Sequence, residues 1–150
     1  MRIFLALGSN LGDREANLIT AKDLLMKKDV LVVGQSDVRE TKPLGQKNQP
    51  DYLNQVVEVR SSLGPMELLQ VCKEVEAEMG RPGARVGNVK FGEEKWESRV
   101  IDVDILFYGD KEIRTAELTI PHPGALERDF ILEGMKDLDE EFISSRIMGS

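Results

Sequence analysis

The stretch WESRVIDVDILFYGD, residues 96–110, places two carboxylates inside an apolar strand pattern. Side chains alternate between the faces of a β-strand, so the odd-numbered apolar residues from Ile101 to Phe107 are expected on one face. Asp102 and Asp104 then share the other face, about 7 Å apart along the strand. Because an isolated buried carboxylate is costly, this second face is expected to meet water, cations or a metal ion. Taken alone, the pair fits a solvated edge strand better than a metal site.

The sequence on both sides of this strand predicts an α+β fold in a single domain, residues 1–150. An N-cap at Asp13, Pro65 at a helix start and Gly80 at a helix end mark two amphipathic helices. The order βαββαβ is that of a ferredoxin-like core, in which an antiparallel sheet carries both helices on one face. A C-terminal helix is expected to follow. The expected strands are 2–8, 30–41 (bent or bulged at Gly34), 52–60 and the strand within 96–110; the expected helices are 13–28, 65–80 and 124–138.

Composition indicates an ordinary globular chain and excludes several classes of function. The net charge of −7 argues against general nucleic-acid binding, and no apolar run is long enough for a transmembrane helix. The single cysteine, Cys72, excludes an internal disulfide, and the first apolar run is too short for a signal peptide. We therefore expect a cytoplasmic protein that binds neither nucleic acid nor membrane. We further expect a monomer that acts on small molecules, although composition does not establish this.

This chain could bind phosphate through a hard metal ion together with arginine side chains. Mg²⁺ binds through one or two carboxylates plus phosphate oxygens, so the aspartate pair could hold two ions. Arg99 can offer a bidentate fork to phosphate from a locally basic segment, Arg81 to Arg99. His122 is flanked by prolines that stiffen its backbone. A basic segment is as readily a charged surface loop, however, and a lone histidine is more often structural.

Two loops carry ligand-type residues without specifying a ligand. GSNLGD, residues 8–13, lacks the spacing of a phosphate-binding or dinucleotide-binding loop and is expected to be a tight turn between strand and helix. The segment 42–54 brings turn residues next to Tyr52 and Asn54. An amide beside an aromatic ring suits a flat, hydrogen-bonding heterocycle, although this signal is weak by itself.

Four motifs together resemble one enzyme family far more specifically than the aspartate pair does. Their order and spacing are similar to those of 6-hydroxymethyl-7,8-dihydropterin pyrophosphokinases of folate biosynthesis, from about Phe4 to Leu132. The resemblance implies a ferredoxin-like fold and transfer of pyrophosphate from ATP to the hydroxymethyl group of the pterin, with release of AMP. The motifs are LGSNLGDR (7–14), PLGQKNQPDYLN (43–54), ESRVIDVDILFYG (97–109) and IPHPGALERDFIL (120–132).

The resemblance also implies a role for each matching residue. Asp102 and Asp104 would be catalytic and bind Mg²⁺, with two ions expected and ATP as co-substrate. Arg81 and Arg99 would be the catalytic arginines. The residues implied to contact ATP are Glu76, Trp96, Arg99, Ile105, His122 and Arg128, and those implied to bind the pterin are Thr41, Leu44, Tyr52, Asn54 and Phe130.

The chain departs from the family pattern in places, and two other functions stay open. The loop 81–98 is long, KWESR stands where the family often has RWGPR, and the tail EGMKDLDEEFISSRIMGS lacks the usual Pro-Leu. The alternatives are another two-metal nucleotidyl transferase on the same fold, and a ligand-binding ferredoxin-like module without catalysis. The first would not need the pocket motif at 43–54, and the second predicts no dependence on the aspartate pair.

Overall fold

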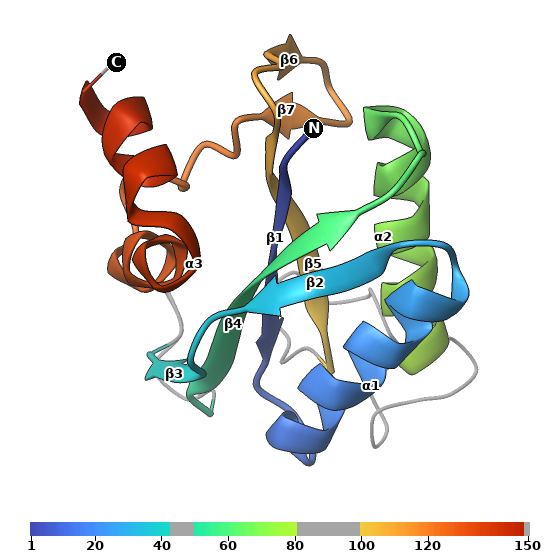
Figure 1. Cartoon of the computed structure of the whole chain (residues 1–150). Coiled ribbons are helices and arrows are strands. Elements are labelled where there is room, and N and C mark those ends of the chain that lie inside the picture. The colour runs from blue at the N-terminus through green and yellow to red at the C-terminus, as the bar shows by residue number, and fades with distance from the viewer. Residues whose placement is uncertain (43–49, 81–99, 149–150) are drawn as a thin grey trace.

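A five-stranded antiparallel sheet forms the centre of the molecule, as Figure 1 shows. The structure is a computed structural model that describes residues 1–42, 50–80 and 100–148. The strand order is β2-β4-β1-β5, and β3 pairs with β4 beyond the end of β2. A separate short hairpin, β6–β7, was not expected from the sequence. The strands are β1 (Ile3–Ser9), β2 (Leu31–Gln35), β3 (Arg39–Thr41), β4 (Tyr52–Arg60), β5 (Asp102–Tyr108), β6 (Ile113–Arg114) and β7 (Thr119–Ile120).

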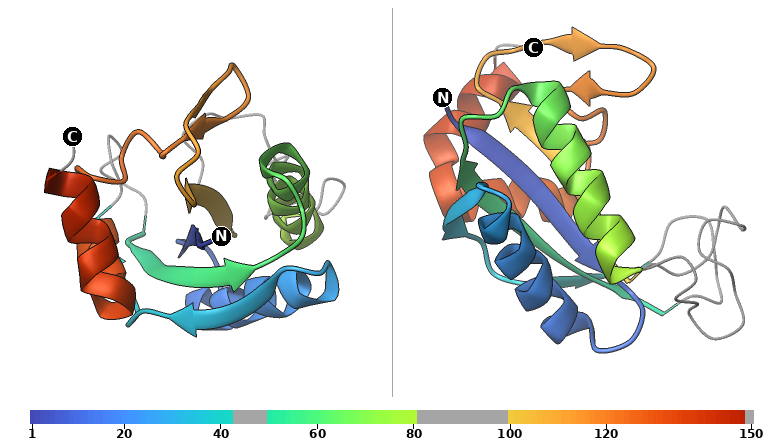
Figure 2. Two further views of the ribbon diagram at one scale, coloured as in Figure 1. Left: turned by 45° about the horizontal axis from the view of Figure 1, so that its top comes forward. Right: turned by 90° about the vertical axis from the view of Figure 1, so that its right-hand side faces the viewer.

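In the described residues, three helices cover the two faces of the sheet unequally. Helices α1 (Arg14–Lys27) and α2 (Pro65–Met79) pack on one face, and α3 (Asp129–Met148) packs on the other (Figures 1 and 2). None of these helices, in the part of the chain that the structure describes, is long and apolar enough to cross a membrane. The sheet is therefore closed by two cores, here called the helix-side core under α1 and α2 and the α3-side core.

Local chemistry explains where α1 and α2 begin. The Asp13 carboxylate accepts a hydrogen bond from the backbone N–H of Ala16 at 3.1 Å, as expected for an N-cap. Pro65 opens α2, and the Glu67 carboxylate accepts the Gly64 N–H at 2.9 Å. Buried Leu18, Ala21 and Leu25 of α1 and Leu68, Cys72 and Val75 of α2 form the stripes that reach the helix-side core.

The predicted elements are largely confirmed up to Gly80. The strand at 52–60 and the helix that begins at Pro65 have the expected bounds. The expected strand 30–41 is divided into β2 and β3, with a register shift against β4 between Val32 and Gly34. The bulge predicted near Gly34 is thus present.

A second bulge, in β5, corrects the predicted alternation of that strand. Phe4 pairs with Phe107 and Leu5 with Ile105, so Leu106 is an extra residue. Ile105 lies in the helix-side core as expected, but Phe107 lies with Leu106 in the α3-side core. The prediction that Phe107 shares a face with Ile105 was wrong because the bulge reverses the alternation after Leu106.

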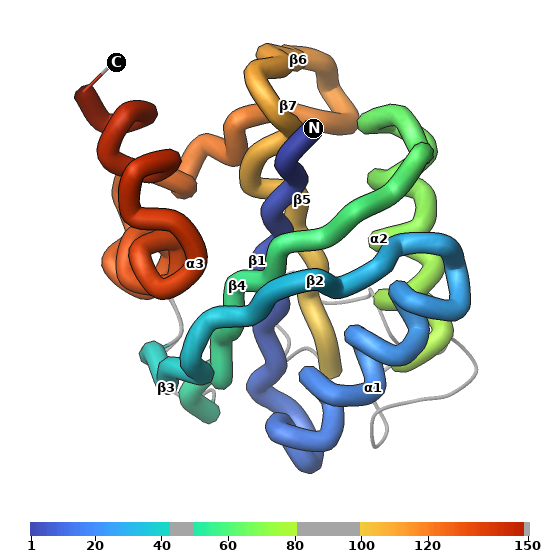
Figure 3. Tube along the Cα trace, in the orientation of Figure 1, coloured from blue at the N-terminus to red at the C-terminus, as the bar shows by residue number. Residues whose placement is uncertain are grey.

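The C-terminal helix is also displaced from the expected 124–138. Residues 123–127 form turns, and α3 begins at Asp129 and continues to Met148 in two segments that run in different directions (Figure 3). The break is at Asp139, whose backbone is non-helical (φ −162°, ψ 93°) and whose carboxylate accepts the Phe142 N–H at 2.9 Å. The tail therefore belongs to the fold: the Phe142 ring lies 4.9 Å from that of Phe4 in the α3-side core.

Candidate active site

Three residues on neighbouring strands lie side by side on the face of the sheet that packs against α3, at the end of the strands beyond the α3-side core. Gly8 of β1 pairs with Asn54 of β4 on one side and with Asp102 of β5 on the other. Directly paired residues of antiparallel strands share a face, so the side chains of Asn54 and Asp102 stand on either side of the Gly8 backbone. We call Asn54, Gly8 and Asp102 the polar row. None of the three belongs to the α3-side core, which is built around Phe4, Val56 and other apolar residues.

The position of Gly8 between Asn54 and Tyr52 leaves little room for a larger residue. A Cβ atom added to Gly8 would lie 3.1 Å from Asn54 Oδ1 and 3.5 Å from the Tyr52 ring. The missing side chain thus lets Tyr52 and Asn54 lean over β1. A flat ligand resting on Gly8 would meet the Asn54 amide and an aromatic side chain together.

The amide of Asn54 has a defined orientation. Asn54 is 6% exposed, and its Nδ2 donates a hydrogen bond to Thr41 Oγ1 at 2.6 Å. Thr41 belongs to β3, in which Arg39 pairs with Asn54 and Thr41 pairs with Tyr52. Thr41 therefore lies on the same face of the sheet as Asn54. Three of the five residues predicted to bind the pterin, Thr41, Tyr52 and Asn54, are therefore brought together.

Carboxylates gather on the other side of Gly8. Asp102 is half-buried and Asp104 is exposed, both on the face predicted from the sequence. Between them, the Val103 N–H donates to Glu76 Oε2 of α2 at 2.8 Å, which ties the outer edge of β5 to that helix. Burial raises the pKa of the nearby Cys72 thiol, and the negative charges of Glu76 and Asp104 raise it further. This corner of the molecule therefore carries a concentration of negative charge that favours cations.

The donor set fits Mg²⁺. Within the described ranges there is no group of three or more histidine, cysteine, aspartate or glutamate side chains that could enclose a metal ion. Mg²⁺ does not require one, because it commonly uses one or two carboxylates and keeps positions for water and phosphate oxygen. Asp102 and Asp104 are two carboxylates on a strand whose other face is packed, so the backbone that carries them is held in place.

The bulge in β5 positions His122. The carbonyl of the extra residue, Leu106, accepts the His122 backbone N–H at 3.0 Å, and His122 Nδ1 accepts the Gly124 N–H at 3.0 Å. When the ring is neutral, its proton is therefore on Nε2. A Cβ on Gly124 would lie 3.0 Å from Arg128 Nε and 3.5 Å from His122 Nδ1, so the two predicted ATP contacts occupy one turn.

The remaining predicted residues divide into three groups. Phe130 is partly buried against the α3-side core. Ile105 is 3% exposed in the helix-side core, so a contact with ATP would have to come from its backbone. The other predicted site residues, Arg81, Leu44, Trp96 and Arg99, lie outside the described residues.

Sequence reasoning missed the supporting role of the turn at 8–14. Asn10 Nδ2 donates to the Pro50 carbonyl at 3.2 Å, and Arg14 Nη1 donates to the Asp51 carbonyl at 2.7 Å. Both bonds hold the chain directly before Tyr52. The motif LGSNLGDR contained these residues, but nothing in its spacing connected them with residues 37 to 40 positions away.

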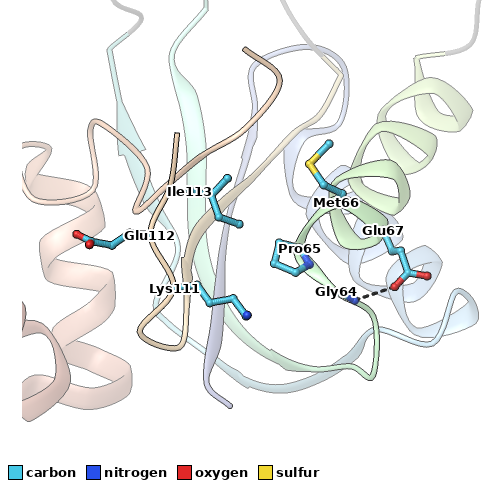
Figure 4. Close-up of a pocket in the computed structure, with 7 residues that line it drawn as sticks. All are labelled: Gly64, Pro65, Met66, Glu67, Lys111, Glu112 and Ile113. Carbon is cyan, nitrogen blue, oxygen red and sulfur yellow. Dashed lines mark hydrogen bonds between the residues drawn. The ribbon is translucent and has the colours of Figure 1, made fainter. Parts of the chain in front are cut away.

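A hollow elsewhere on the surface is separate from the polar row. It has a volume of about 400 Å³ and lies between the first turn of α2 and the turn that leads into β6 (Figure 4). The Glu67 side chain is hydrogen-bonded to Gly64 at its edge. The polar row lies at the other end of α2, where Glu76 reaches β5. The lining residues are Gly64, Pro65, Met66, Glu67, Lys111, Glu112 and Ile113.

Comparison with known protein families identifies the family of the chain. The sequence model of the family 7,8-dihydro-6-hydroxymethylpterin-pyrophosphokinase (HPPK) matches residues 4–140. The chain belongs to the HPPK family. The matched range includes every described residue of the polar row and its neighbours as far as Arg128.

Relatives within the HPPK family include single enzymes and parts of larger proteins. The 2-amino-4-hydroxy-6-hydroxymethyldihydropteridine pyrophosphokinase of Bacillus subtilis is 37% identical over 92% of this chain and 78% of its own length. The enzyme of the same name from Aquifex aeolicus is 39% identical over 94% of this chain and 82% of its own. The mitochondrial folate synthesis bifunctional protein of Pisum sativum is 36% identical over 99% of this chain, which spans 27% of that protein.

Solved structures of HPPK-DHPS proteins share the fold. One, in complex with substrates, superposes with a TM-score of 0.62 at 15% identity over 91% of this chain, which spans 40% of that structure. Another, HPPK-DHPS A437G of Plasmodium falciparum with pteroate, has a TM-score of 0.60 at 18% identity and covers 91% of this chain and 37% of its own. At these identities the likeness supports the antiparallel sheet with its helices.

Proposed function

We propose that the polar row and its neighbours form the active site at which this chain transfers pyrophosphate from ATP to 6-hydroxymethyl-7,8-dihydropterin. The chain is a pyrophosphokinase of folate biosynthesis, as its family and its bacterial relatives indicate. One observation carries the assignment of the site: the register that sets Asn54 and Asp102 on the two sides of Gly8. An amide for a heterocycle and carboxylates for a metal–phosphate group then face one another across a single strand.

The reaction requires two substrates to be aligned. The hydroxymethyl oxygen forms a bond to the β-phosphorus of ATP, and the bond from that phosphorus to the α–β bridging oxygen breaks. AMP leaves, and the hydroxyl proton passes to a base. Bound Mg²⁺, proposed as two ions on Asp102 and Asp104, would neutralise the phosphate charge and align the reacting oxygens.

The protein side chains supply orientation. Asn54 is proposed to hydrogen-bond the pterin ring, with Tyr52 and Phe130 on its faces, while His122 offers Nε2 and Arg128 a guanidinium to ATP. Holding two reactants in a reactive geometry is the larger part of catalysis in phosphoryl transfer. Glu76, Ile105, Leu44, Trp96, Arg81 and Arg99 keep their predicted roles as proposals.

Three further assignments belong to the same proposal. The order of strands and helices up to β5, with the sheet order β2-β4-β1-β5, supports a ferredoxin-like core. We also propose that residues 1–150 form one domain and that the enzyme acts as a monomer on small molecules. A cytoplasmic location stays a prediction from the sequence.

The first test removes one charge at a time. We expect Asp102→Asn and Asp104→Asn each to lower the rate of AMP formation about a hundredfold or more. Each substitution removes a charge that can stabilise the transition state by several kcal/mol, and about 1.4 kcal/mol corresponds to a tenfold change in rate. The melting temperature without ligand should stay level or rise, since two like charges repel. Calorimetry with MgATP should show weaker binding in both variants.

A matched control makes the same chemical change outside the site. Asp110, 93% exposed in its side chain, follows the end of β5, so Asp110→Asn should leave turnover unchanged. Near-normal turnover in both test variants would mean that the aspartate pair is only part of a solvated strand edge and does not bind a catalytic metal ion. AMP formation that does not depend on the pterin alcohol would favour another nucleotidyl transferase, and no AMP formation at all would favour a binding module.

A further inference from the structure

Strand β3 is shorter than β4, the other strand that carries residues of the proposed pterin site. It has three residues and pairs with β4 through Arg39↔Asn54, Glu40↔Leu53 and Thr41↔Tyr52. It also carries Thr41, whose hydroxyl orients the Asn54 amide. So short an edge strand needs additional contacts to hold a side chain in place to the accuracy that binding requires.

An ion-pair clasp holds β3 from the α3 side. Arg39 Nη1 and Nη2 donate to the two oxygens of Asp137 at 2.8 and 3.3 Å, and Arg39 Nε lies 3.3 Å from Glu133. The same Asp137 carboxylate accepts the Asp37 backbone N–H at 3.1 Å. The Arg39 guanidinium, with that N–H, holds the pKa of the Asp137 carboxyl below its usual range. Figure 1 shows β3 at the edge of the sheet close to α3.

A second ion pair holds β3 from the opposite side. Glu40 points to the helix face, because it pairs with Leu53 of the helix-side core. Arg14, the first residue of α1, donates from Nη1 to Glu40 at 2.7 Å and to the Asp51 carbonyl at 2.7 Å. One guanidinium thus connects β3 with the residue directly before Tyr52.

The chain that enters β3 is anchored as well. Ser36 is 5% exposed; its N–H donates to the Val56 carbonyl at 2.8 Å and its hydroxyl accepts the Val56 N–H at 2.9 Å. The Gln55 amide donates to the Ser36 carbonyl at 2.8 Å. With Ser36 fixed on β4, the position of Thr41 depends on how the next residues are held, which is the part that Arg39 and Arg14 contact.

We propose that Arg39 and Arg14 are positioning residues for the pterin substrate, which clamp β3 from its two faces and so fix the Thr41–Asn54 hydrogen bond. The inference rests on the proposed site, in which Asn54 binds the pterin. Besides the direct contact proposed for Phe130, it gives helix α3 an indirect part in substrate binding through Asp137. Partly exposed ion pairs contribute little to global stability, so their effect should appear in binding more than in folding.

The experiment removes the clasp and measures each substrate separately. Arg39→Gln and Asp137→Asn should each raise KM for 6-hydroxymethyl-7,8-dihydropterin about five- to tenfold, the size expected when one hydrogen bond to a ligand is lost. KM for ATP should change less than twofold. Arg14→Gln should act in the same direction. Arg39→Lys keeps the charge without the fork, so its KM should lie between wild type and Arg39→Gln.

Lys28→Gln is the matched control. Lys28 is as exposed in its side chain as Arg39 (25% against 24%) and pairs with Glu74 and Glu78 between α1 and α2, away from β3. It should shift the melting temperature by a similar amount and leave both KM values unchanged. A purely structural role for Arg39 would make its variant behave like Lys28→Gln.

A double variant tests the route through Thr41. If Arg39 acts by placing Thr41, Arg39→Gln combined with Thr41→Val should be no worse for pterin KM than Thr41→Val alone. Full additivity, an unchanged pterin KM in Arg39→Gln, or an equal change for ATP would each overturn the inference. Asn54→Ala separates the two levels: an unchanged pterin affinity there would overturn the proposed site and the clamp together. A loss in Asn54→Ala without one in Arg39→Gln would overturn the clamp alone.

Discussion

At the scale of single residues, the missing side chain of Gly8 makes a sharp prediction. Gly8→Ala would place a methyl group 3.1 Å from Asn54 Oδ1, closer than ordinary contact, so the amide must move. We expect about tenfold weaker pterin binding, corresponding to about 1.4 kcal/mol, with MgATP affinity changed far less. Calorimetry with each ligand measures both.

A second glycine provides the control for that substitution. Gly64→Ala adds the same methyl group at the far end of the molecule, where it would lie 3.5 Å from Glu67 Oε1, an ordinary contact distance. It should leave both affinities unchanged. Pterin binding that is normal in Gly8→Ala would mean that the ring does not rest against Asn54.

Some of these residue contacts could be predicted from the sequence and others could not. The alternation of residues 101–105 was enough to place Asp102 and Asp104 together on a face away from Ile105. The contact of Thr41 with Asn54 depends on the β3–β4 register, which no local pattern specifies. Resemblance to the family named both residues, but it gave no physical reason for their contact.

At the scale of elements, predictions failed where distant partners decide the local structure. The helix bounds at Asp13 and Pro65 follow from capping chemistry within four residues. The bulge at Leu106 instead depends on pairing with β1, about a hundred residues earlier. It also depends on His122, whose backbone N–H donates a hydrogen bond to the Leu106 carbonyl. The break at Asp139 depends likewise on Arg2 at the other end of the chain.

The break in α3 predicts a difference between two substitutions at one position. Asp139 both caps the second helical segment through the Phe142 N–H and pairs with Arg2. Asp139→Ala removes both, and we expect a loss of about 1–2 kcal/mol in the free energy of unfolding. Asp139→Asn keeps an acceptor for the N–H and should cost less. Urea unfolding measures both, and an equal loss in the two variants would show that capping is not the cause.

At the scale of the whole molecule, two carboxylates of α3 predict how stability depends on pH. The pKa of Asp137 is lowered by Arg39, and that of Asp139 is lowered by the Phe142 N–H and by Arg2. Because both folded pKa values lie below the unfolded value of about 3.9, their stabilisation is present above pH 4. It is lost as the pH falls through the folded values.

Urea midpoints between pH 5 and pH 2.5 test this dependence. The wild-type midpoint should fall with decreasing pH, and the fall should be smaller in a double variant, Asp137→Asn with Asp139→Asn. Parallel pH profiles for the two proteins would mean that other carboxylates dominate acid unfolding.

Because β1 lies between β4 and β5, the sheet fixes the distance between the two sides of the proposed site. Neighbouring strands lie about 4.7–4.9 Å apart, so the backbones of Asn54 and Asp102, two spacings apart across Gly8, are separated by about 10 Å. Side-chain substitutions cannot lengthen this distance, because only the insertion or removal of a strand between β4 and β5 would change it. A pterin with a hydroxyethyl arm would carry its oxygen about one carbon–carbon bond, roughly 1.5 Å, out of place. We expect such an analogue to bind beside Asn54 yet to react about a hundredfold more slowly, because Asp102, at the proposed metal site, stays at its fixed distance across β1.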